Sequence, residues 1–133
     1  MNREIVTPKK SMTEEKVDFI SLEGEDGSFG ILKGHNPMLA SIKIAPVFYD
    51  RSGKREYIAV MGGVVRVLDN TVTIVTEDAE RAVEIDELIA KKEKDAAEAY
   101  LTRKTEITDM VKVEVQLRKA LVRLKVVQTS KRI

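Results

Sequence analysis

The fold of this chain is decided by residues 71–92, TVTIVTEDAERAVEIDELIAKK. Over residues 71–74, hydroxyl-bearing and apolar side chains alternate, as they do along a half-buried β-strand. From about Ala79 onward, apolar residues instead return every three or four positions, as on one side of an α-helix. The stretch therefore predicts a change from strand to helix between Thr76 and Ala79.

Glycine and proline are distributed in the same way. All seven glycines and all three prolines precede Val64, and none follows it. These residues punctuate the turns between short strands, and their absence favours uninterrupted helix. We therefore predict a β-rich domain over residues 1–78 and a helical domain over residues 79–133.

The front half contains short apolar runs separated by turn signals. The turn signals are residues 50–53, 62–63 and 69–70. The apolar runs are EIV, KVDFISL, FGIL, SIKIAPVFY, EYIAVM, VVRVL and TVTIVT. Many short strands at this spacing predict a β-sandwich or a flattened barrel.

The tail carries two apolar stripes at helical spacing, separated by TRKTEITD, and therefore predicts an antiparallel two-helix hairpin. The first stripe comprises Ala82, Ile85, Ile89, Ala96 and Tyr100, and the second comprises Met110, Val113, Leu117, Leu121 and Leu124. Both stripes are thin and the first is rich in alanine, so burial stabilises the hairpin little. We expect a tail that can detach from the rest of the chain or rearrange.

The charges of the two helical segments are opposite. Residues 78–98 hold eight acids and four bases, whereas residues 113–133 hold six bases and one acid, so the segments would attract each other when folded back. The same pattern also fits two ordinary solvated helix faces, because exposed ion pairs contribute only about 0.2–1 kcal/mol each. The net charge of +1 argues against a nucleic-acid partner.

Groups that could carry catalysis are scarce. The chain has a single histidine, His35, and no cysteine, so thiol nucleophiles and thiolate metal sites are excluded and we expect no metal. It also lacks a GxSxG elbow and a phosphate-binding P-loop. The chain begins MNREIVTP, without the apolar run of a signal peptide, and we expect a soluble protein in a reducing compartment.

One segment stands out from the others: GSFGILKGHNPML, residues 27–39. Its glycines and Pro37 constrain a specific turn between apolar residues. Taken alone, the segment fits a sandwich corner with His35 hydrogen-bonded inside it better than it fits a binding surface.

Together with three further motifs, this segment resembles the epsilon subunit of F-type ATP synthases. The motifs are GxFGILxGHxPxL, the pair Gly62-Gly63, TVTI at residues 71–74 and AERAxEID at residues 79–86. The resemblance covers nearly the whole chain and implies an N-terminal β-sandwich of about ten strands followed by a C-terminal two-helix hairpin. It also implies a non-catalytic part of the central rotor, at the cytoplasmic face of the bacterial plasma membrane and held there only through the complex.

Within that family, the sandwich binds the gamma subunit and touches the membrane rotor ring, which couples proton or sodium flow to ATP synthesis. Ser28, His35 and Met38 match the rotor-facing region, although Ser28 stands where glutamate is common. The hairpin of the family can also extend into the catalytic head of alpha and beta subunits and inhibit ATP hydrolysis. The resemblance implies that four cations would then meet acidic surface on the beta subunits: Arg118, Lys119, Arg123 and Lys125.

Some bacterial members bind ATP on the folded hairpin through the motif I/L-D-x-x-R-A, which here reads IDELIA. Ile89 replaces the arginine, and a lost charged hydrogen bond costs about 1.5–3 kcal/mol, or one to two decades of affinity. The family's other ATP-binding positions are occupied here by Glu80, Asp86, Ala90 and Arg123, which match, and by Lys119, which stands where an arginine is usual. We therefore expect no cofactor and weak or absent binding of ATP.

Two other classes of function remain open from the residues alone. The first is a free-standing adaptor in which a β-sandwich carries a partner-binding helical hairpin. The second is a small hydrolase that uses His35.

Overall fold

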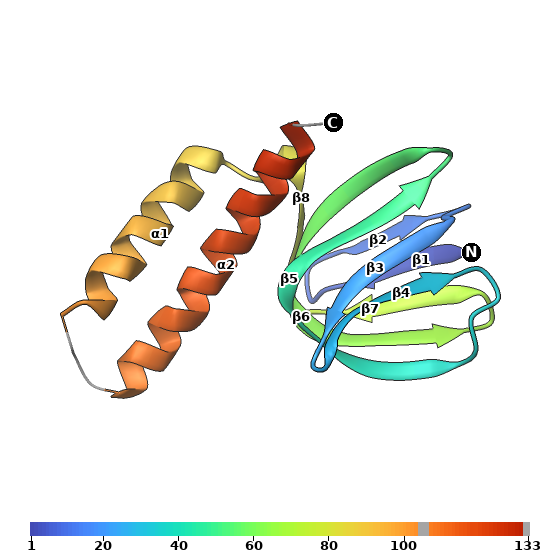
Figure 1. Ribbon diagram of the computed structural model, residues 1–133, viewed down its shortest axis with the longest axis horizontal. Coiled ribbons are helices and arrows are strands. Elements are labelled where there is room, and N and C mark those ends of the chain that lie inside the picture. Colours follow the sequence, from blue (N-terminus) through green and yellow to red (C-terminus); the bar gives the residue numbers. More distant parts are fainter. Residues whose placement is uncertain (104–106, 132–133) are drawn as a thin grey trace.

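The computed structural model describes residues 1–103 and 107–131, which form a β-sandwich followed by two helices (Figure 1). The strands are β1 (Asn2–Val6), β2 (Ser11–Glu14), β3 (Phe19–Gly24), β4 (Gly27–Leu32), β5 (Met38–Arg51), β6 (Lys54–Leu68), β7 (Thr71–Val75) and β8 (Ala79–Arg81). The helical elements are the 3-10 turn η1 (Ala82–Glu84) and the helices α1 (Glu87–Leu101) and α2 (Ile107–Lys131). The predicted fold class, a sandwich followed by a two-helix hairpin, is confirmed.

Seven strands follow one hydrogen-bonded path, in the order β2-β1-β7-β6-β5-β3-β4, and β8 pairs with β6 beside it. Every pairing among the described strands is antiparallel except that of β1 with β7. β5 and β6 are 14 and 15 residues long and run through both layers of the sandwich. Because each of them serves both layers, the described residues hold eight strands and not the predicted number of about ten.

β5 and β6 turn the corner between the layers at Gly62 and Gly63. The register of β5 with β6 is the same on both sides of the corner, where Ile42 pairs with Gly63 and Ile44 pairs with Met61; the ladder is interrupted only between Lys43 and Gly62, which lie opposite each other. The positions of β6 that face the core change there from even to odd numbers. The corner therefore keeps both halves of the strand facing one core.

Glycine is required at this corner. The φ angles of Gly62 and Gly63 are +76° and +126°, and a Cβ on Gly63 would lie 2.0 Å from the carbonyl oxygen of Val75. The sequence predicted that this pair separates two strands, and that prediction is wrong. Positive φ angles bend the chain here without ending its pairing with β5.

The sandwich has an apolar core of its own. Every residue of that core cluster lies within residues 1–79, so neither helix contributes to it. Ile5 and Ile74 come from one layer, and Ile20 and Val47 come from the other. Full burial of such a side chain stabilises a fold by about 1.5–3 kcal/mol, and the sandwich can therefore fold without the hairpin.

A buried arginine joins the two layers. Arg3 is 4% exposed, and its guanidinium carbon lies 4.5 Å from the centroid of the Tyr49 ring. Burial, followed by the hydrogen bond that Tyr49 donates to Glu56, raises the pKa of Tyr49 to about 12. The cation–π contact links β1 to β5 in place of an apolar pair.

α2 lies between α1 and the sandwich (Figure 1). Val122 and Val126 of α2 pack against Ala59 and Met61 on the outer face of β6. The partly buried residues around this contact are Ile44, Tyr57, Ala82 and Ile85. The contact is small, and the hairpin is therefore docked by much less apolar burial than the sandwich contains.

The two predicted stripes of the hairpin are only partly buried. Leu121 is 44% exposed and Ile89 is 54% exposed, so both stripe predictions are wrong at these positions. α2 faces two neighbours, and its buried residues shift toward the sheet at Val122 and Val126. α1 buries only alanines, Ala90 and Ala97. Over the described residues, neither helix is long and apolar enough to span a membrane.

The strand-to-helix change occurs later than predicted. Ala79, Glu80 and Arg81 form β8, which pairs with residues 58–60 of β6, so the prediction of helix at these three residues is wrong. Pairing with β6 outweighs the local helical pattern. α1 begins only after Asp86, whose carboxylate accepts a hydrogen bond from the backbone nitrogen of Ile89 at 3.1 Å.

We predict that Gly63→Ala lowers the free energy of unfolding by more than about 3 kcal/mol, because the new Cβ would overlap a backbone oxygen that cannot move away. Gly53→Ala is the matched control, since Gly53 also has a positive φ, of +78°, but no atom within 4 Å of the added Cβ. Its cost should be about 1–2 kcal/mol. Urea unfolding of the full chain measures both, and equal losses would contradict the proposed role of the corner.

Candidate functional site: the seam between sandwich and hairpin

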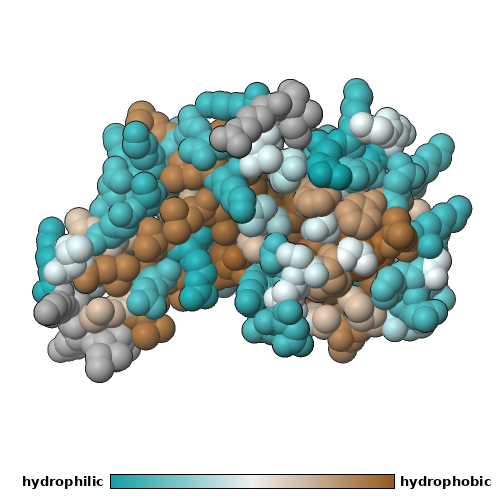
Figure 2. Space-filling view, viewed as in Figure 1, coloured by the Kyte–Doolittle hydropathy of each residue, from teal (hydrophilic) through white to brown (hydrophobic). Residues whose placement is uncertain are grey.

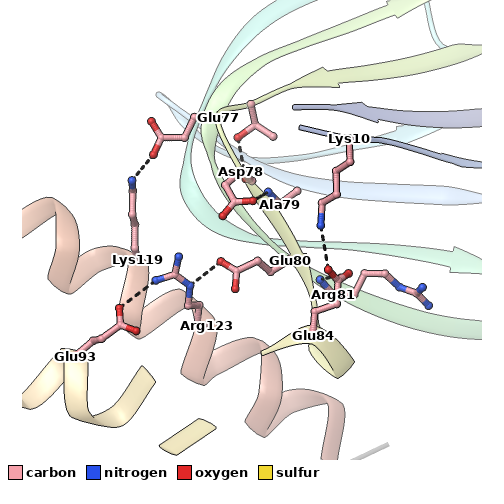
Figure 3. A network of polar contacts seen from close by, with 11 residues as sticks. Lys10, Glu77, Asp78, Ala79, Glu80, Arg81, Glu84, Glu93, Lys119 and Arg123 are labelled. Carbon is pink, nitrogen blue, oxygen red and sulfur yellow. Dashed lines mark hydrogen bonds and ion pairs between the residues drawn. The ribbon is translucent and has the colours of Figure 1, made fainter. Parts of the chain in front are cut away.

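A network of ion pairs surrounds the contact between sandwich and hairpin (Figure 3). Each pair joins segments that are far apart in the sequence. The pairs are Lys119 with Glu77, Arg123 with Glu80 (2.7 Å) and Glu93 (3.5 Å), Lys10 with Glu84 (3.0 Å) and Lys131 with Glu87 (2.9 Å). The opposite charges predicted for the two tail segments therefore form ion pairs, some between the two helices and some between α2 and the sandwich.

Arg123 is the centre of the network. Its Nε donates to Glu80 of β8 and its Nη1 donates to Glu93 of α1, so one guanidinium joins the sandwich to both helices. The side chains of Arg123 and Glu80 are only 20% and 19% exposed, which weakens screening by solvent. Charge-assisted hydrogen bonds of this kind are about twice as strong as neutral ones.

The segment that carries the sandwich carboxylates is fixed by backbone hydrogen bonds. The carbonyl of Asp78 accepts from the backbone nitrogen of Met61 at 3.1 Å and from the hydroxyl of Thr76 at 3.1 Å. The Asp78 carboxylate accepts from the backbone nitrogen of Ala79 at 2.9 Å. Glu77 and Glu80, on either side, therefore belong to the rigid sandwich.

The outer ion pairs are more solvated than the Arg123 pair. Glu77 is 64% exposed, and the hydrogen bond from Lys119 lowers the pKa of its carboxyl. The pKa of Glu84 is lowered in the same direction, first by the hydrogen bond from Lys10. Exposed pairs stabilise little individually, so their effect lies in fixing the position of the hairpin.

A pocket of about 220 Å³ beside Arg123 contains four of the five predicted ATP-binding residues. It is lined by Glu80, Ile85, Asp86, Ile89, Ala90, Glu93 and Arg123. Lys119, the fifth predicted residue, pairs with Glu77 and does not line the pocket.

The charges in this pocket do not suit a triphosphate. Ile89 adds no cation to its wall, and the single guanidinium already pairs with Glu80 and Glu93. Asp86 is engaged as the cap of α1. Arg123 would have to leave its protein partners before it could bind phosphate.

The four cations predicted to contact the catalytic head fall into two classes. Arg118 and Lys125 are exposed, whereas Lys119 and Arg123 are held by carboxylates of the sandwich and of α1. The docked chain therefore does not present all four to a partner at once. The sequence could not show this division, because it depends on which side of α2 faces the sandwich.

The predicted rotor-facing residues lie away from the seam. Ser28 of β4 donates a hydrogen bond to a carboxylate oxygen of Glu23 at 2.7 Å, and the two residues are cross-strand partners. Ser28 and Met38 line one groove of about 410 Å³. Glu23, which no sequence pattern distinguishes, places a carboxylate beside the serine that stands where glutamate is common.

His35 is exposed in the loop between β4 and β5. Its Nδ1 lies 2.7 Å from the carbonyl oxygen of Asn36, the partner recorded for this ring among the described residues. The interpretation that His35 is enclosed inside a sandwich corner is therefore wrong. The geometry gives no support to a hydrolase built on this residue, since an exposed ring against a backbone carbonyl activates no nucleophile.

The hairpin leaves apolar side chains uncovered. In the view of Figure 2, apolar side chains form a band along the hairpin, with hydrophilic side chains around it. The exposed apolar residues of η1, α1 and α2 are Val83, Leu88, Ile89, Val111 and Leu121. An exposed apolar surface of this kind is typical of a helical pair that can also pack against another protein surface.

We predict that acid weakens the docking of the hairpin. The pKa of Glu77 and that of Glu84 are lowered by their docked partners, so these pairs stabilise docking fully above the undocked pKa, near 4.5. That stability is lost as the pH falls through the lowered values. Urea unfolding should give a lower free energy of unfolding at pH 3 than at pH 7, and the difference should be smaller in Glu77→Gln than in the unsubstituted chain. An identical difference in the two chains would contradict the prediction.

We predict that ATP does not bind with submillimolar affinity, since Ile89 replaces an arginine and the one guanidinium of the pocket is already paired. Calorimetric titration of the full chain with ATP tests this directly. Ile89→Arg should raise the affinity, because it adds a cation to the pocket wall. Submillimolar binding by the unsubstituted chain would overturn the prediction.

Both halves of the chain match models of known domains. Residues 1–82 match the β-sandwich domain of the ATP synthase delta/epsilon chain, and residues 84–128 match its long α-helix domain. The boundary between these matches lies within η1, after β8, as the structure also places the end of the sheet.

Curated relatives are similar over nearly the whole length. The ATP synthase epsilon chain of Nitratidesulfovibrio vulgaris (strain DP4) is 40% identical over 126 residues, covering 95% of this chain and 94% of the relative. The ATP synthase epsilon chain of Bacillus licheniformis is 38% identical over 122 residues, covering 92% and 93%.

The fold also matches a chain in a solved structure. A chain in the cryo-EM structure of the Euglena gracilis mitochondrial ATP synthase, OSCP/F1/c-ring, superposes with a TM-score of 0.79 at 21% identity, covering 92% of this chain and 78% of that one. At this identity the likeness concerns the fold alone. The matched domains and the nearly full-length relatives confirm the resemblance found in the sequence: this chain belongs to the ATP synthase delta/epsilon chain family.

Proposed function

We propose that this chain is the epsilon subunit of an F-type ATP synthase, a non-catalytic component of the central stalk. The observation that carries the proposal is that both domains match the family, in the same order and over nearly the whole chain. Two solved assemblies with chains of similar fold support it, one described as OSCP/F1/c-ring and the other as central stalk and c-ring. In this role the chain couples ion-driven rotation to ATP synthesis.

The sandwich would be the part that binds the gamma subunit and the rotor ring. The outer face of the layer formed by β5, β6 and β7 exposes Leu39 (72%), Val64 (39%), Leu68 (43%) and Val75 (53%). Apolar side chains at this density favour a protein partner over solvent. Ser28 near the start of β4, His35 in the loop between β4 and β5, and Met38 at the start of β5 would extend the contact toward the ring.

The hairpin would be the regulatory part. Its small contact with β6 lets it leave the sandwich at modest cost in apolar burial. Extended toward the catalytic head, it would present Arg118, Lys119, Arg123 and Lys125 to acidic surface on the beta subunits and inhibit ATP hydrolysis. We place the complex at the cytoplasmic face of a bacterial plasma membrane, since the curated relatives are bacterial.

The test compares the reconstituted complex containing the full chain with one containing the chain truncated after Asp86. Truncation at the predicted boundary, Ala79, would remove β8 and unpair residues 58–60 of β6, so the later site is the informative one. The truncated sandwich should still co-purify with the gamma subunit, and ATP hydrolysis should rise severalfold.

The two outcomes separate the two parts of the proposal. Failure of the full chain to bind gamma in a pull-down would contradict the rotor assignment and favour a free-standing adaptor. Unchanged hydrolysis with intact gamma binding would contradict only the inhibitory role of the hairpin.

A further inference from the structure

We propose that Glu77 and Glu80 of the sandwich compete with the catalytic head for the same two cations, Lys119 and Arg123. The docked hairpin is then held by two ion pairs, Lys119 with Glu77 and Arg123 with Glu80, which we call the clasp. The clasp needs no bound nucleotide. The part of this inference that concerns the head rests on the function proposed above.

The clasp has matched spacing on its two sides. Lys119 and Arg123 are four residues apart and therefore lie on the same side of α2, one turn from each other. Glu77, between β7 and β8, and Glu80, in β8, face them (Figure 3). A shift of α2 by one turn would pair at most one of these cations, so the clasp fixes the docked register.

The carboxylates and the cations belong to bodies that separate. The hydrogen bond from the backbone nitrogen of Met61 to the carbonyl of Asp78, together with the pairing of β8 with β6, ties the carboxylate segment to the sandwich. Lys119 and Arg123 move with α2 when the hairpin leaves. Their side chains are only 23% and 20% exposed in the docked state, so a partner's carboxylates cannot pair with them until the clasp opens.

Glu93 of α1 makes this arrangement independent of nucleotide. Its carboxylate lies 3.5 Å from Nη1 of Arg123, in the pocket where Ile89 stands in place of an arginine. Two carboxylates therefore neutralise the cation that a phosphate would need. The energy that docks the hairpin comes from these pairs and from the small apolar contact beneath them.

Competition predicts opposite effects for the two sides of the clasp. Removing the carboxylates frees the hairpin and leaves all four head-facing cations in place, so inhibition of ATP hydrolysis rises. Removing Lys119 and Arg123 also frees the hairpin but takes away two head-facing cations, so inhibition does not rise. A clasp without competition would give the same effect from either side.

The experiment measures docking and inhibition separately. The chain has no cysteine, so Lys54→Cys on β6 and Gln128→Cys on α2, both exposed, allow specific labelling for distance measurement in the full chain. The test variants are Glu77→Gln with Glu80→Gln, and Lys119→Gln with Arg123→Gln. The matched control is Arg118→Gln with Lys125→Gln, which removes two cations of α2 that lie outside the clasp.

Both test variants should raise the undocked fraction by roughly five- to thirtyfold, whereas the control should leave the label distance unchanged. In the reconstituted complex, Glu77→Gln with Glu80→Gln should strengthen inhibition, and the control should weaken it. A long label distance in the control, or an unchanged distance in either test variant, would overturn the clasp.

A wrong function and a wrong clasp give different results. If both test variants undock and neither changes hydrolysis, the clasp proposal is supported and the inhibitory role of the hairpin is wrong. If the carboxylate variant undocks and inhibition falls, as it does in the cation variant, competition for Lys119 and Arg123 is wrong.

Discussion

The fold depends on the corner at Gly62 and Gly63, where β6 passes from one layer of the sandwich to the other. Because the strand stays paired with β5 through the corner, one chain segment lines the core on both sides of it. The same bend gives β6 two different outer faces. Ala59 and Met61, before the corner, receive α2, whereas Val64 and Leu68, after it, remain exposed. The face of β6 that docks α2 and its exposed apolar face are thus separated by two glycines.

The two halves of the molecule are stabilised in different ways. The sandwich buries a continuous apolar core and needs no residue from the helices. The hairpin buries alanines between its helices and a few valines on β6. Its position on the sandwich therefore depends more on directional charge pairs than on apolar contacts. Apolar contacts are non-directional, whereas the pairs of Lys119 and Arg123 are satisfied in only one register. The hairpin can therefore be weakly held and still precisely placed.

The sequence predicted the two-part architecture because period and composition change together near Thr76. It misplaced what depends on tertiary contacts. Gly62-Gly63 reads as a turn unless the partner strand is known, and β8 reads as helix because its pairing with β6 is remote in sequence. At the seam, the residues near Asp86 were predicted together by their motif. Glu93 and Glu77 were missed, since exposed glutamates on charged segments carry no pattern that distinguishes a paired one.

The replacement of an arginine by Ile89 connects the local chemistry to the behaviour of the whole tail. The pocket has a single guanidinium to offer a phosphate group, that of Arg123, because Ile89 adds no cation. The acids of the pocket are nevertheless satisfied, because Arg123 pairs with Glu80 and Glu93, and Asp86 caps α1. Each carboxylate of the pocket thus has a partner within the protein and needs no ligand. The carboxylates of another protein would have to compete with Glu80 and Glu93 for Arg123.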